Sequence, residues 1–181
     1  MNKLAIALSA ALSLGAAASA HAADATITFS GKVVASTCSV DVGGGGSTST
    51  VTLRQINPGA HKADNTVGST PFTITLTAAS SGDATCSKDN ARLVIDQTNS
   101  NLSANGTITN SGSGTNAEVK LVDAATETDI NLKDLDDPYL VSKKAGTDFK
   151  YNWIARYHNP TSAALTEGDF SGRLVFDVDN Y

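Results

Sequence analysis

The sequence predicts an all-β protein built as one antiparallel sandwich, and three observations support this prediction. Short segments alternate apolar and polar residues, clusters of Gly, Ser, Asn and Asp separate them, and no helical period persists for three turns after residue 22. Hydrophobic residues make up 40% of the 181-residue chain and charged residues 17%, so we expect a folded domain. We find no tandem repeat and no domain boundary within the sandwich.

The segments expected to form strands follow one another along the chain. They are residues 26–34, 38–42, 51–53, 71–78, 91–96, 119–122, 128–132, 149–157 and 170–181. One face of the 149–157 strand carries Phe149, Tyr151, Trp153, Ala155 and Tyr157. Residues 43–50 are rich in Gly, Ser and Thr and should form a flexible, exposed loop. The glycosylation sequons at Asn101 and Asn105 are interpreted as loop positions.

Residues 1–22 have the pattern of a secretory signal peptide. Lys3 supplies a basic start, residues 4–15 are apolar, and Ala20-His21-Ala22 is a small-x-small cleavage site. The alternative is an N-terminal membrane anchor, which the shortness of the apolar stretch disfavours. We therefore expect the chain to be exported and residues 1–22 to be removed. The rest is long enough for one hydrophobic core and short for two.

The exported part keeps two cysteines, Cys38 and Cys86. In an oxidising compartment the expected state is one structural disulfide. It would close a loop of about 50 residues and contribute about 4 kcal/mol in the chain-entropy model. Two free thiols or a metal pair remain the alternative, which no CxxC motif supports.

Charge and motifs argue against several classes of function. The net charge is −5 and no Lys/Arg cluster is present, which disfavours nucleic acid and anionic lipid as partners. We find no P-loop, GxGxxG, GxSxG or HExxH motif, so we expect no enzymatic activity, no cofactor and no metal site. Asp134, Asp136 and Asp137 lack the glycine and the distal glutamate of an EF-hand loop, and we interpret them as a solvated turn.

The N-terminal strand of the exported chain allows two interpretations. One face of it carries Ala25, Ile27, Phe29, Gly31 and Val33. From periodicity alone, an ordinary edge strand is the favoured interpretation. The alternative is a strand that leaves its own domain and adds to the open sheet edge of another subunit, with its alternate side chains filling pockets.

The sequence resembles the chaperone–usher pilins, the type 1-like fimbrial subunits. The resemblance rests on the signal peptide, on residues 23–34 (ADATITFSGKVV) and on Cys38-Ser39-Val40. Further matches are the strand at 72–76 (FTITL) leading toward Cys86, and Ala155-Arg156-Tyr157. The similarity extends over essentially the whole exported chain. It favours the second interpretation of the N-terminal strand.

The resemblance implies an incomplete immunoglobulin-like sandwich that lacks its final strand and is completed by a donor strand from a neighbouring subunit. Residues 23–34 would be the donor-strand extension and residues 35–181 the pilin domain, with Ala25, Ile27, Phe29, Gly31 and Val33 as donor side chains. The acceptor groove and the chaperone-contact strand would include Gly168, Phe170, Leu174, Phe176, Val178 and Tyr181. A periplasmic chaperone would lend a strand to the groove until an outer-membrane usher exchanges it. The filament would lie on the bacterial surface and support adhesion, with no membrane insertion.

The C-terminus departs from the family pattern. Gly168 is the fourteenth residue from the end, as the family has it, but Asn180 stands where the penultimate tyrosine is usual and Tyr181 is last. We keep the register in which Leu174, Phe176 and Val178 face inward, since a one-residue slip would turn them outward. The role of Tyr181 in chaperone recognition is then in question.

Three functional classes follow from the sequence. We favour a major, shaft-forming fimbrial subunit, because the chain has both a donor strand and a complete C-terminal strand. A minor, adaptor or adhesive subunit that binds a host receptor through its loops is the alternative. The third class is a free-standing secreted sandwich with a closed sheet, which should have a polar or absent N-terminal segment.

Overall fold

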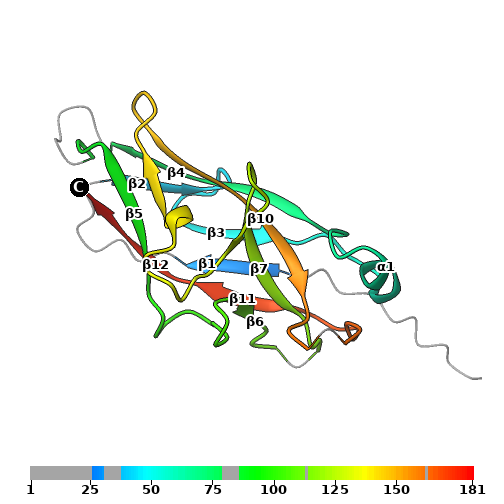
Figure 1. Cartoon of the computed structure of the whole chain (residues 1–181). Helices are drawn as coiled ribbons and strands as arrows, with labels where there is room; N and C mark the ends of the chain where they lie inside the picture. The colour runs from blue at the N-terminus through cyan, green and yellow to red at the C-terminus, as the bar shows by residue number, and fades with distance from the viewer. Residues whose placement is uncertain (1–25, 31–37, 79–85, 113, 162) are drawn as a thin grey trace, which may run out of the picture.

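The structure is a computed structural model that describes residues 38–78, 86–112, 114–161 and 163–181, together with the strand backbone of residues 26–30. It is an all-β sandwich-like fold, as predicted (Figure 1). The strands are β1 (Thr26–Ser30), β2 (Cys38–Val42), β3 (Thr48–Thr52), β4 (Thr70–Ala78), β5 (Asn90–Ile95), β6 (Ile108–Thr109), β7 (Glu118–Asp123), β8 (Asp129–Ile130), β9 (Val141–Lys143), β10 (Phe149–His158), β11 (Ser171–Leu174) and β12 (Phe176–Asn180).

The described strands form three hydrogen-bonded groups. A six-stranded sheet has the order β2-β4-β10-β7-β6, with β8 on the edge of β7. The other two groups have the orders β11-β1-β3 and β12-β5-β9. Since β11 and β12 follow each other along the C-terminal segment, this segment belongs to both smaller sheets. It therefore connects the sheet that contains β1 to the sheet that contains β5 and β9.

The core forms where the alternation of the sequence is strongest. In β10 every second residue from Phe149 to Tyr157 is buried, which confirms the predicted inward face. Trp153 lies edge-on to Phe72 of β4 at 6.1 Å between ring centroids and edge-on to Tyr151 at 5.9 Å. Such T-shaped pairs add to the free energy gained by removing the rings from water.

The disulfide between Cys38 and Cys86 is present, as the sequence predicted. The two Cα atoms are 4.8 Å apart and both residues are buried. Cys38 is the first residue of β2, and Cys86 lies shortly before β5. The bond therefore ties the six-stranded sheet to the sheet that contains β12.

Several local predictions were wrong. No helix was expected, but residues Pro58–Ala63 form the six-residue helix α1. Asn57 caps its N-terminus, because the Asn57 side chain accepts a hydrogen bond from the Gly59 backbone N–H. Residues 43–45, 47 and 48 are exposed, as predicted for the 43–50 loop. The segment is a tight turn and not a flexible break, because Asp41 accepts backbone hydrogen bonds from Gly44 and Gly46. The strand β3 already begins at Thr48.

The acidic segment 134–137 is only partly the solvated turn that was expected. Asp137 is buried, and its carboxylate accepts hydrogen bonds from the backbone N–H groups of Asn131 and Tyr139. It caps the short 3₁₀ helix η1 (Pro138–Leu140). Its role there is structural.

The described residues contain no group of three or more His, Cys, Asp or Glu residues that could hold a metal ion. No helix in this part of the chain is long and apolar enough to cross a membrane.

Candidate functional site

The position of β1 is the most informative feature of the fold. β1 lies between β3 and β11, as Figure 1 shows. It runs antiparallel to β3, with Thr26 opposite Thr52 and Ser30 opposite Thr48. It runs parallel to β11, with Thr26 opposite Ser171. β1 therefore fills a slot between two strands that do not pair with each other.

The edges of this slot depend on β1 for their hydrogen bonds. Among the strands that the structure describes, β3 and β11 have no ladder partner other than β1. The opposite edge of β11 is covered, because the backbone N–H groups of Asn101 and Ser111 donate to the carbonyls of Arg173 and Ser171. Without a strand in the slot, one edge of β11 and one edge of β3 would carry a row of unpaired backbone groups.

Apolar residues flank the slot on both sides. Val51 of β3 and Leu174 of β11 are buried, and so is Phe170, which precedes β11. Gly172 stands opposite Ile27 and has no room for a side chain, because an added Cβ would overlap with Ile108 and Phe170. The slot thus combines apolar surface with two strand edges that need a hydrogen-bonding partner, and an extended apolar-alternating strand satisfies both needs.

The predicted residues of the C-terminal strand lie where the register required. Phe170, Leu174 and Phe176 are buried, and Val178 is half-buried against the core. Gly168 is exposed and lies in the turn before β11, at φ +146° and directly against the backbone of Gly114. Phe170 and Leu174 lie beside the slot, whereas Phe176 and Val178 lie in β12, which pairs with β5, and Gly168 lies outside the slot.

The predicted donor residues are only partly visible. Ile27 and Phe29 lie in β1. Ala25, Gly31 and Val33 lie outside the described residues, as do the signal peptide and most of the 23–34 extension. In the single chain β1 pairs with β3 and β11 of the same chain, and the role of this strand as a donor to another subunit stays a prediction.

The C-terminal strand changes partner at Val175, between β11 and β12. The backbone N–H of Val175 donates to the buried Ser100 hydroxyl at 2.8 Å, and its carbonyl accepts from the Asp96 N–H at 2.9 Å. The Asp96 carboxylate accepts hydrogen bonds, and the one from the Asn99 side chain has the largest effect on its pKa. These hydrogen bonds hold the pKa of Asp96 below its usual value. This network directs β11 toward the slot and β12 toward β5. The apolar–polar alternation of residues 170–181 does not indicate this change of partner at Val175.

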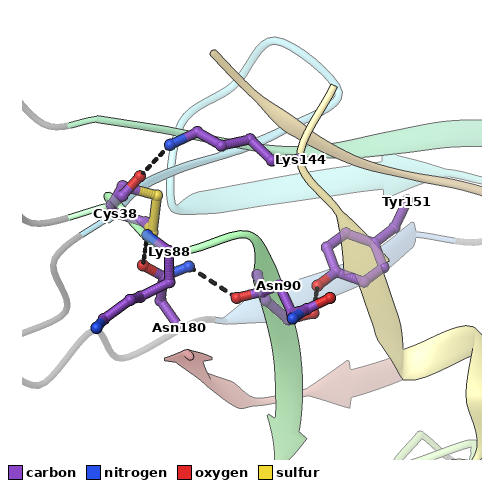
Figure 2. The surroundings of a disulfide bond; sticks show 8 residues. Cys38, Lys88, Asn90, Lys144, Tyr151 and Asn180 are labelled. Carbon is purple, nitrogen blue, oxygen red and sulfur yellow. Dashed lines mark hydrogen bonds between the residues drawn. A yellow bond between two sulfur atoms is a disulfide. The ribbon is translucent and has the colours of Figure 1, made fainter. Parts of the chain in front are cut away.

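The chain end is fastened beside the disulfide (Figure 2). The Asn180 side chain accepts from the Lys88 N–H at 3.1 Å and donates to the Asn90 carbonyl at 2.8 Å. The backbones of Asn90 and Tyr181 exchange two further hydrogen bonds. Lys144 Nζ donates to the Cys86 carbonyl at 2.7 Å. The residue that replaces the expected tyrosine therefore secures the last strand.

Tyr151 and Tyr181 have different surroundings at this end of the fold. The buried hydroxyl of Tyr151 donates to the Ala91 carbonyl at 2.7 Å, and burial raises the pKa of this phenol well above its usual value (Figure 2). Tyr181 is 47% exposed, with the guanidinium of Arg92 at 5.9 Å from its ring centroid. Tyr181 therefore belongs to the surface at the end of β12 and does not line the slot.

Comparisons with known proteins point to one family. The family model described as fimbrial protein matches residues 27–180. A solved structure, the tip adhesin CupB6 from Pseudomonas aeruginosa, aligns at 14% identity and a TM-score of 0.36, over 60% of this chain and 33% of that chain. The match thus spans about a third of the length of that adhesin. A search of curated proteins gave no match.

Proposed function

The chain belongs to the fimbrial protein family, and from this premise we propose that it is a structural subunit of a chaperone–usher fimbria that polymerises by donor-strand exchange. The observation that carries the proposal is the slot between β3 and β11, which an extended strand completes. In the filament, the N-terminal strand of the next subunit occupies this slot.

The proposed division of the chain follows from this role. Residues 1–22 direct export and are removed, residues 23–34 form the donor strand, and residues 35–181 form the pilin domain. A periplasmic chaperone covers the slot until the outer-membrane usher passes the subunit to the growing fimbria. An open slot beside apolar residues is an aggregation hazard, so an occupant is needed at every stage.

The physical chemistry of the slot explains how a filament can grow without a nucleotide. A donor that fits better replaces one that fits less well, and the gain in pairing and burial drives the exchange. Each contact joins the N-terminal strand of one subunit to the slot of another, so the interface is heterologous and does not close. Subunits joined in this way should separate extremely slowly.

Within this role we favour a major, shaft-forming subunit. Such a subunit needs a donor strand and an acceptor slot in the same chain, and this chain offers β1 and the β3–β11 slot. A minor, adaptor or adhesive subunit that binds a host receptor through its loops is the alternative. Immunogold labelling separates them, because a major subunit labels the whole shaft and an adhesive subunit labels the tip.

The first test places a charge in the donor strand. We expect Phe29→Asp to lower surface filament by at least about tenfold, because a carboxylate cannot enter an apolar pocket without a partner. The periplasmic level of the variant should stay normal, since its acceptor slot remains open to the chaperone. The measurement is filament shed from the cell surface, with subunit in the periplasm quantified by immunoblot.

The matched control is Thr28→Asp, which adds the same charge to the adjacent residue, on the opposite face of the alternation. It should leave filament levels close to those of the unaltered chain. Equal amounts of filament from the Phe29→Asp variant and the unaltered chain would remove the basis of the donor-strand proposal.

A further inference from the structure

We propose that three side chains, Ser100, Asn110 and Ser111, close the edge of β11 that faces away from the slot, so that β11 accepts a strand at one edge only and the fimbria grows without branches. We call them the guard residues, and this edge the far edge of β11. The inference deepens the proposed function and rests on it, because an open strand edge is most harmful in a protein that assembles by adding strands.

The far edge of β11 is where a second strand would add. β11 pairs with β1 at the slot edge, and the carbonyls of Ser171 and Arg173 point to the far edge, where backbone N–H groups donate to them. The segment that follows β6 lies along this edge, and β6 itself contacts β11 (Figure 1). An uncovered edge pairs readily with an extended strand, including a donor strand.

The guard residues pair with the backbone of the far edge through their side chains. Asn110 Oδ1 accepts from the Ser171 N–H at 2.9 Å, and Ser111 Oγ donates to the Ser171 carbonyl at 2.8 Å. The Ser100 hydroxyl accepts from the Val175 N–H at 2.8 Å and donates to the Val175 carbonyl at 3.2 Å. Both backbone groups of Ser171 and of Val175 therefore have side-chain partners.

A side chain closes a strand edge more completely than another strand does. A strand added at the far edge would present a free edge of its own, so the same hazard would move one strand outward. An amide or hydroxyl side chain supplies the same kind of hydrogen bond and extends no ladder. In the part of the chain that the structure describes, β11 is accordingly the last strand of its sheet.

Hydrogen bonds and burial hold the guard residues in place. The Asn110 side chain makes four hydrogen bonds, the full capacity of an amide. Its Oδ1 also accepts from the Gly112 N–H at 3.0 Å, and its Nδ2 donates to the carbonyls of Thr115 and Asp169. Ser100 is buried. A strand that displaced these side chains would leave polar groups without partners, which opposes its entry.

The number of open edges decides the form of the polymer. One donor strand and one acceptor edge per subunit give an unbranched filament, since each heterologous contact uses one of each. A subunit whose β11 is open at both edges would bind two donor strands, and the fimbria would branch or aggregate. The guard residues therefore act on the specificity of assembly and leave the slot unchanged.

Peptide binding to assembled fimbriae tests the inference, because the proposed function requires that the slots along an assembled shaft are already filled. The probe is a labelled peptide with residues 23–34 of this chain. The guard variant is Ser100→Ala/Asn110→Ala. Fimbriae are isolated from cells that express the full chain or its variants, and bound peptide per subunit is measured by fluorescence and located by electron microscopy.

The matched control removes the same two types of side chain from neighbouring positions and is Ser103→Ala/Asn116→Ala. The Ser103 hydroxyl bonds to Thr107 Oγ1 at 2.7 Å, and Asn116 Oδ1 accepts from the Thr166 N–H at 2.9 Å. These two bonds join loop residues and involve no backbone group of residues 171–175. Urea unfolding should show similar losses of stability in the two double variants.

Fimbriae of the guard variant should bind about tenfold or more peptide per subunit than fimbriae of the control variant or of the unaltered chain, because lost hydrogen bonds open the far edge along the shaft. Micrographs should show bound peptide along the shaft together with branch points. If the double variant forms no fimbriae, Asn110→Ala decides by the same measurement, with Asn116→Ala as its control. Asn110 is only half-buried, so this single variant is the milder change.

The outcomes separate this inference from the proposed function. Equal peptide binding by the guard and control variants would overturn the role of the guard residues and leave donor-strand exchange standing. Peptide bound at every subunit on fimbriae of the unaltered chain would show that the slots stay open in the filament, which would overturn the proposed function.

Discussion

Gly168 and Gly114 lie backbone to backbone in the turn before β11. An added Cβ at Gly168 would overlap with the Cα and carbonyl of Gly114, and its φ of +146° already disfavours any other residue. The resemblance to pilins associates Gly168 with chaperone recognition. The turn alone requires glycine at this position, whether or not a chaperone touches it.

We expect Gly168→Ala to lower the free energy of unfolding by about 2–4 kcal/mol, from backbone strain and from overlap that packed backbone cannot relieve. Gly44→Ala is the matched control, because Gly44 also has a positive φ of +85° but nothing within 4 Å of an added Cβ. It should cost only about 1 kcal/mol. Urea unfolding measures both. Equal losses would show that the contact with Gly114 is unimportant.

Asn180 secures the end of β12 through two side-chain hydrogen bonds. Asn180→Ala removes both and leaves the Lys88 N–H without this acceptor, so we expect a loss of about 1–2 kcal/mol in urea unfolding. The exposed neighbour Asp179 provides the control, and Asp179→Ala should change stability by less than about 0.5 kcal/mol. If Asn180→Ala unfolds at the same urea concentration as the unaltered chain, the fastening of the C-terminus contributes no stability.

At the scale of elements, long alternating strands were predictable and short elements were not. β4 and β10 were expected within one residue of their observed ends, since their alternation of buried and exposed residues is strict. The helix α1 has six residues, too few to establish a helical period. β6 and β8 have two residues each, so only their tertiary partners define them.

The alternation of the C-terminal segment predicted which of its side chains are buried, but it did not predict which strands they pair with. Alternation indicated that Leu174 and Phe176 face inward, and both are buried. Nothing in the alternation of β1 distinguishes the chain's own slot from that of a neighbour, because both would bury the same face. The change of partner at Val175 depends on Ser100, which is 75 residues away in the sequence. A pattern read within one segment cannot contain such a contact.

The disulfide acts at the junction between β2 and the segment that leads into β5. We expect the double variant Cys38→Ser/Cys86→Ser to lose up to about 4 kcal/mol, because the unfolded chain regains the freedom of a loop of about 50 residues. Its steady-state level in the periplasm should fall accordingly. Changing both cysteines avoids a free thiol that could cross-link chains. Unchanged abundance and unchanged urea unfolding would show that the bond is dispensable.

At the scale of the whole molecule, β1 occupies the position between β3 and β11, and the source of a strand at this position can be varied. A chain that begins at residue 35 should unfold at lower urea concentration than one that begins at residue 23, or should aggregate. The expected loss is several kcal/mol, because β1 makes nine cross-strand pairs, five with β3 and four with β11, each worth about 0.2–1 kcal/mol.

Moving residues 23–34 to a position after Tyr181, on a short linker, should restore the stability of this truncated chain. A strand that returns from the end of β12 can form a hairpin with β12 and β11, so it would enter the slot antiparallel to them and by local contacts. The same rearranged chain with Phe29→Asp is the matched control and should stay unstable, since only the fit of the strand has changed. Urea unfolding compares the four chains. If truncation at residue 35 leaves the midpoint unchanged, the sandwich is complete without β1, and the basis for assembly by strand exchange is lost.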